Sequence, residues 1–250
     1  MRRAVVRVQR LLPYRAAMVS RRLTRPLAGL ALPVLLSACI FGSGGGGEKR
    51  PAPAPSKPRQ SGPITLNGPT PRETQQCFTD LSRAGVRYSP LPDRDFGGGC
   101  IVQGAVQLLD IGVPVGGIKS MRCPLARAFT GWVQFAVAPA ARQILGSDLV
   151  RVDTFGTYVC RAIVGGTQPG SKLSEHGRAN AVDVSGFVLK DGRRITILKD
   201  WANPDPAIRS FLETIHGSAC RRFATVLSPN YNYVHRDHFH LDMGRGPFCA

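Results

Sequence analysis

The stretch SEHGRANAVDVSGFVLKDGRRITIL, residues 174–198, combines a hairpin signal with a polar cluster. Asp191 and Gly192 stand between the apolar runs AVDVSGFVL and ITIL, and Asp-Gly between two such runs predicts a β-hairpin. The first run contains Asp183, a carboxylate among alanine and valines in a segment expected to be buried. His176 precedes it by seven residues. Burying an unpaired carboxylate in such a segment destabilises the fold by several kcal/mol, so we expect Asp183 to have a partner such as a cation.

The rest of the chain supplies further strands and two longer helical segments. Residues 124–145 and 206–220 carry apolar side chains at helical spacing, and Pro139 is expected to break or bend the first segment near its end. The tail DHFHLDM, residues 237–243, indicates a final strand. Strands joined mainly by hairpins, with helices grouped between them, predict an α+β domain with a mainly antiparallel sheet.

The charge distribution argues against a nucleic-acid-binding protein. The 250-residue chain has a net charge of +17, but residues 1–62 hold 12 Lys and Arg against one acidic residue. That segment accounts for +11 and leaves +6 for the rest of the chain. We therefore expect no nucleic-acid partner for the folded part.

The N-terminal segment has the form of an export signal. Three arginines precede PLAGLALPVLLSAC, whose apolar run is too short for a permanent membrane span. Its ending resembles the bacterial lipobox, which implies a signal peptide over residues 1–39 and a membrane anchor through a lipidated Cys39. Met18 is an alternative start. We expect a Gly/Pro-rich tether over residues 40–70, a monomeric domain over residues 71–250, and a periplasmic location at the outer membrane.

Six cysteines remain after Cys39, an even number that indicates disulfides in an exported chain. They allow fifteen pairings, and the sequence leaves the choice open. A zinc–thiolate site is the rival interpretation, but there is no Cys-x-x-Cys pair. The six residues are Cys77, Cys100, Cys123, Cys160, Cys220 and Cys249.

The histidines suggest a metal site. His238 and His240 are two residues apart, so on a strand they face the same side. A catalytic zinc ion takes three protein ligands from imidazole and carboxylate groups and keeps a fourth position for water. His176, Asp183 and His240 would supply that set.

Two motifs carry a family resemblance. SEHGRANAVD resembles the Ser-x-His-x-x-Gly-x-Ala-x-Asp motif of zinc D-Ala-D-Ala carboxypeptidases, and HFHLD resembles the His-x-His motif of a superfamily that includes penicillin-insensitive murein endopeptidases and hedgehog domains. Together with VLKDGRR, they look like the bacterial extensin-like C-terminal domain family over about Cys77 to Cys249. One departure is Ala179, which stands where the carboxypeptidase motif has glycine and warns against assuming the same substrate pocket.

The resemblance implies Zn²⁺ bound by His176, Asp183 and His240, and hydrolysis of peptide bonds in peptidoglycan. The proton acceptor is His238, favoured because it shares a face with His240, or alternatively Asp237, which would otherwise orient His238. Arg161 would hold an oxyanion or a substrate carboxylate. The alternative function is a non-catalytic, zinc-containing peptidoglycan-binding lipoprotein. A third hypothesis, a structural envelope lipoprotein that binds no metal, has less support than either of these.

Four further polar residues have open roles at this stage. Ser174 lines the site or caps a turn, and His235 lies at the cleft rim or outside it. Asp242 either hydrogen-bonds a ligand imidazole or is a solvated strand end. His216 is expected to have no catalytic part.

Overall fold

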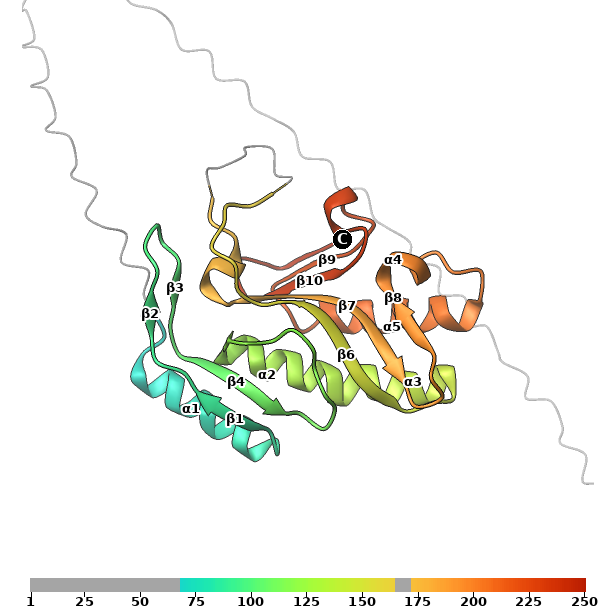
Figure 1. Cartoon of the computed structure of the whole chain (residues 1–250), viewed down its shortest axis with the longest axis horizontal. Helices are drawn as coiled ribbons and strands as arrows, with labels where there is room; N and C mark the ends of the chain where they lie inside the picture. The colour runs from blue at the N-terminus through green and yellow to red at the C-terminus, as the bar shows by residue number, and fades with distance from the viewer. Residues whose placement is uncertain (1–67, 165–171) are drawn as a thin grey trace, which may run out of the picture. The chain divides into compact units, whose positions relative to one another are not determined.

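The computed structural model describes residues 68–164 and 172–250 (Figure 1). The predicted signal peptide, the lipobox Cys39 and nearly all of the predicted tether lie outside these residues. Within the described part, no helix is both long and apolar enough to cross a membrane.

A six-stranded sheet forms the centre of the domain and carries the predicted hairpin. The strand order is β11-β9-β10-β7-β6, with β8 also paired to β7. All these pairs are antiparallel except the parallel pair of β11 and β9, so the prediction of an α+β domain with a mainly antiparallel sheet is confirmed. The bounds are β6 (Leu149–Gly156), β7 (Ala181–Leu189), β8 (Arg194–Thr196), β9 (Thr225–Leu227), β10 (Phe239–Asp242) and β11 (Phe248–Cys249).

The strand after the hairpin turn is shorter than ITIL suggests. Thr196 ends β8 and begins the short helix α4 (Ile197–Asp200), because its hydroxyl accepts a hydrogen bond from the Lys199 backbone. The Asp200 carboxylate accepts one from the Thr196 backbone in return. This reciprocal capping turns the second half of the apolar run into a helix.

A long helical segment packs against β7 through Trp132. It comprises α2 (Cys123–Trp132), the π-helical turn η1 (Val133–Val137) and α3 (Ala138–Leu145). Of the two expected effects of Pro139, a break or a bend, the break does not occur. The wider turn immediately before Pro139, where the Ala138 N–H bonds to the Val133 carbonyl, carries the helix past the residue that lacks an N–H.

The core lies between these helices and the sheet. Trp132 is fully buried, and its ring lies 6.2 Å from that of Phe187 on β7. Phe187 in turn packs at 5.5 Å against Phe211 of α5 (Pro206–Cys220). The Trp132 indole N–H donates to the Ile215 carbonyl at 2.9 Å, so α2 and α5 are fixed to each other and to the strand that carries Asp183.

The N-terminal part of the described chain packs along α2 as a smaller layer (Figure 1). Helix α1 begins in a capping box between Thr70 and Glu73. The layer contains a three-stranded sheet in the order β1-β4-β5 and a two-stranded sheet of β2 and β3. The bounds are α1 (Pro71–Arg83), β1 (Arg87–Pro90), β2 (Arg94–Asp95), β3 (Ile101–Val102), β4 (Ala105–Asp110) and β5 (Met121–Arg122).

The six cysteines form three disulfides, as the even count predicts. The pairs are Cys77–Cys123, Cys100–Cys160 and Cys220–Cys249. The Cys100–Cys160 disulfide connects the loop after β2 to the segment that leads toward His176. It also explains why residue 177 is a glycine, because a Cβ there would lie 3.1 Å from the Cys100 sulfur.

Candidate metal centre

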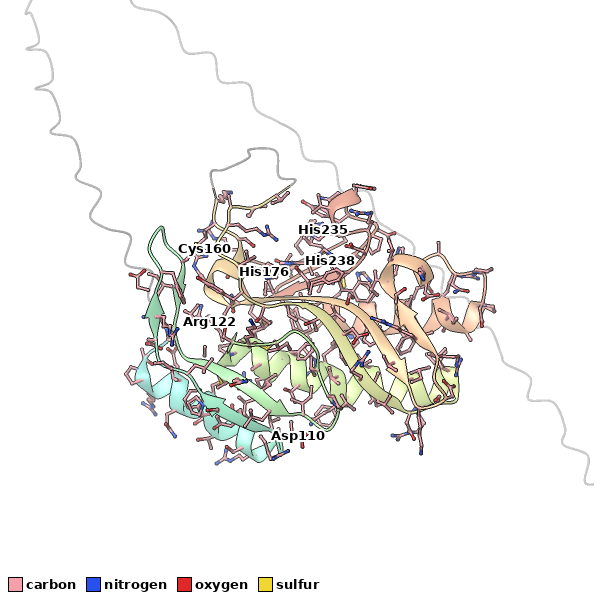
Figure 2. The ribbon with its side chains drawn as sticks, viewed as in Figure 1. Asp110, Arg122, Cys160, His176, His235 and His238 are labelled. Atoms are coloured by element: carbon pink, nitrogen blue, oxygen red, sulfur yellow. A yellow bond between two sulfur atoms is a disulfide. The ribbon has the colours of Figure 1, made fainter. Side chains whose placement is uncertain are left out.

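Strand pairing brings two of the predicted ligands together. In the antiparallel register of β10 and β7, His240 lies directly opposite Asp183. Directly opposed residues project from the same face of a sheet, with Cβ atoms about 5 Å apart. His176 belongs to the 3-10 turn η2 (Glu175–Arg178), which leads into β7. Figure 2 shows His176 near His238 and His235 at this end of the sheet.

The three ligand atoms are mutual neighbours. His176 Nε2 lies 3.1 Å from Asp183 Oδ1 and 3.2 Å from His240 Nδ1, and the last two atoms are 3.0 Å apart. In a tetrahedral zinc site with bonds of roughly 2.0–2.1 Å, ligand atoms are about 3.3 Å apart. The spacing of His176, Asp183 and His240 therefore fits one small divalent metal ion.

In both His176 and His240, the ring nitrogen that points away from Asp183 already has a hydrogen-bond partner. His176 Nδ1 donates to the Thr157 carbonyl at 3.2 Å, and His240 Nε2 donates to Asp242 Oδ2 at 3.0 Å. These contacts leave the other nitrogen of each ring directed at Asp183, the arrangement that metal-binding histidines use. Asp242 thus hydrogen-bonds the imidazole of His240, a candidate metal ligand, and is not a solvated strand end.

The electrostatics of the centre also favour a cation. Burial opposes charge on His240, but hydrogen bonds to Asp183 and Asp242 outweigh it and raise the pKa of His240 to about 9. Burial would raise the pKa of Asp183, yet hydrogen bonds from His176 and His240 and their charges hold it well below its usual range. Without a metal the pocket keeps a proton on His240, and a metal ion would take over that charge.

His238 stands beside the three ligand residues. Its Nδ1 lies 2.9 Å from Asp237 Oδ1, and its Nε2 lies 3.5 Å from Asp183 Oδ1. Asp237 therefore sits behind His238, with one oxygen committed to it. The Nε2 side of His238 lies toward Asp183, next to the candidate metal position.

A family comparison agrees with the extent of this domain. The sequence profile described as Extensin-like protein C-terminus matches residues 75–250. The chain belongs to this family. No curated protein and no solved structure shows a significant match to the chain. The resemblance to zinc carboxypeptidases and murein endopeptidases stays a prediction.

The departure at Ala179 has a backbone explanation. This extensin-like chain places Ala179 just after η2 with φ of +51°, in the left-handed region that glycine enters most easily. Its side chain is fully buried, and it does not line the cavity at the metal centre. Ala179 thus occupies a turn position that glycine would adopt with less strain, and its side chain does not itself shape the cavity.

The cavity beside the ligands has a volume of about 550 Å³. Arg161 lines it, and its guanidinium donates to the Ala162 carbonyl at 3.2 Å. Ser174 both lines the cavity and caps η2, because its hydroxyl accepts a hydrogen bond from the His176 backbone. Tyr231 and Phe248, with ring centres 5.7 Å apart, form an aromatic part of the wall that the motifs did not indicate.

His235 is a buried member of the cavity wall. Its ring centre lies 5.2 Å from that of His238, and its Nδ1 is 2.7 Å from Asn232 Oδ1. Burial, helped by the positive charges of His238 and His240, lowers the pKa of His235 to about 4. The ring is therefore neutral, with Nδ1–H donated to Asn232 Oδ1, and Nε2 has no hydrogen-bond partner in the described part of the chain. The Asn-x-x-His spacing, with Asn232 capping the turn at residues 233–235, was the available sequence signal.

A second group of potential ligands lies elsewhere. His216 Nε2 is 3.9 Å from each sulfur of the Cys220–Cys249 disulfide. With both sulfurs bonded to each other, this group offers no thiolate. The prediction of disulfides in place of a zinc–thiolate site is confirmed for these cysteines.

Proposed function

We propose that the chain is a zinc-dependent peptidase that hydrolyses peptide bonds in the stem or cross-link peptides of peptidoglycan. The observation that carries the proposal is the convergence of His176 Nε2, Asp183 Oδ1 and His240 Nδ1 within 3.0–3.2 Å beside a cavity. Two imidazoles and one carboxylate form one of the ligand sets of hydrolytic zinc sites, which keep one position open.

The donor set also supports the choice of metal. Imidazole nitrogen suits zinc and neighbouring transition metals, whereas calcium and magnesium prefer oxygen ligands. When bound, zinc would lower the pKa of a water molecule and polarise the scissile carbonyl. His176, Asp183 and His240 would hold it, with Thr157 and Asp242 fixing the two rings.

His238 is the proposed proton shuttle. Its Nδ1–H is bound by Asp237, so Nε2 carries the lone pair that accepts the proton of the attacking water. The Asp237 carboxylate stabilises the imidazolium that results, and His238 then passes the proton to the leaving amine. This arrangement favours His238 over Asp237 as the base.

Two other groups would act on the substrate. Arg161, at the cavity wall, would stabilise the oxyanion. His235 is neutral and exposes Nε2 as an acceptor, so it can receive a hydrogen bond from a substrate N–H. The wall-peptide substrate rests on the motif resemblance, and the proposed outer-membrane anchor at Cys39 would place the domain beside that polymer.

The test combines metal analysis with mass spectrometry of digested sacculi. Wild type and His238→Ala are expected to hold one zinc per chain, and His240→Ala none. Only wild type and the matched control His216→Gln are expected to release muropeptides. If wild type holds one zinc per chain and binds to sacculi but cleaves no muropeptide, the result would instead support the non-catalytic alternative. Cleavage by zinc-free His240→Ala would refute the proposal.

A further inference from the structure

One wall of the cavity is a compact charged assembly next to the ligand His240. The Glu175 carboxylate accepts hydrogen bonds from Arg178 Nη1 at 3.1 Å and from Asn180 Nδ2 at 2.7 Å. The chain at Gly244 packs directly on it, since a Cβ there would lie 2.8 Å from the Glu175 side chain. Glu175, Arg178 and Arg245 all line the cavity, and we call these three residues the arginine wall.

The acidic groups of this region already have partners. Glu175 is bound by Arg178 and Asn180, and the Asp242 carboxylate accepts from His240 Nε2 and from the Gly244 backbone. Within residues 68–164 and 172–250, no other aspartate or glutamate lines the cavity. The carboxylates that these residues bring to the cavity are therefore already hydrogen-bonded.

The cations, in contrast, exceed the acids. Arg161, Lys172, Arg178 and Arg245 line the cavity, and they face only Glu175 and Asp242 as acidic liners. These four basic side chains outnumber the two acidic ones by two, so the cavity as a whole favours an anionic ligand.

We propose that the arginine wall is a carboxylate-binding subsite, and that the substrate is an anionic peptide with a free carboxylate close to the scissile bond. A carboxylate can accept two hydrogen bonds from one guanidinium, which gives both orientation and affinity. Arg178 is held in place by Glu175, and Arg245 adds the second positive charge. The carboxylate-binding subsite does not depend on the proposed peptidase function, whereas the position of the scissile bond does.

The test measures binding, so it does not require turnover. Zinc-loaded His238→Ala is titrated calorimetrically with a stem pentapeptide, L-Ala-γ-D-Glu-L-Lys-D-Ala-D-Ala, as free acid and as the form with both carboxylates amidated. The free acid is expected to bind at least about tenfold more tightly than the amide. Arg245→Gln in the same background should abolish that preference and leave the affinity for the amide unchanged.

Arg236→Gln is the matched control, because Arg236 is an exposed arginine that stacks on Tyr233 and does not line the cavity. Equal binding of acid and amide, no binding of either, or an equal effect of Arg236→Gln would overturn the proposal. Wild type that cleaves both peptides equally well would keep the peptidase and reject the subsite. Selective binding of the acid without cleavage would keep the subsite and reject the peptidase.

Discussion

The stability of the metal-free protein should fall as pH rises through the range in which His240 loses its extra proton. The folded protein raises the pKa of His240 from 6.5 to about 9, through hydrogen bonds to Asp183 and Asp242 that outweigh burial. Between these two values the folded state binds more protons than the unfolded state. The free energy of unfolding therefore decreases with pH in this window.

The expected size follows from the shift. A displacement of about 2.5 pKa units corresponds to about 3 kcal/mol, present in full below pH 6.5 and nearly lost at pH 9. Burial lowers the pKa values of His235 and His216, so their effect has the opposite sign and ends near pH 6.5. Stability without metal should thus be greatest near pH 6.5.

Urea unfolding of chelator-treated protein at half-unit steps from pH 5 to 9 measures this profile, with the disulfides kept intact. His240→Gln should remove the descending part above pH 6.5 and keep the ascending part. Saturating zinc should also remove the descent, because the metal replaces the proton. A wild-type curve that stays level or rises between pH 6.5 and 9 would refute the electrostatic account of the centre.

Three other changes test separate parts of the structure. Asp242→Asn should weaken zinc binding about 10- to 100-fold in a chelator competition, because it removes the charged acceptor of His240, and an unchanged affinity would contradict that role. Replacing Cys100 and Cys160 by serine opens a link across 60 residues, and should lower the free energy of unfolding by about 4 kcal/mol in urea. Ala179→Val should cost about 2 kcal/mol or more by the same measurement, since a branched side chain is strained at φ of +51°; a neutral effect would exclude strain there.

The sequence was sufficient for features that depend on local patterns. The Asp191-Gly192 turn, the helix over residues 206–220 and the antiparallel α+β class follow from periodicity and turn chemistry. The ligand candidates came from residue type and motif. Asp183 stood out because a carboxylate in an apolar strand requires a partner.

Other features depend on contacts between distant segments. No local pattern pairs His240 with Asp183 across 57 residues, or selects Cys100–Cys160 among fifteen pairings. The side chains of Asp237 and His238 can contact each other because both residues precede β10, which begins only at Phe239. Local propensity does not determine any of these.

The pairing of β7 and β10 also makes the centre sensitive to errors in strand alignment. A one-residue slip would place Phe239 or Leu241 opposite Asp183 and turn His240 to the other face. A two-residue slip in one direction would oppose Asp242 to Asp183, which sets two carboxylates against each other. The native alignment brings His176, Asp183 and His240 together, so a metal ion would stabilise it over alignments that place Phe239, Leu241 or Asp242 opposite Asp183. Metal uptake during refolding would then report strand alignment, and metal present at that stage would raise the yield of native protein.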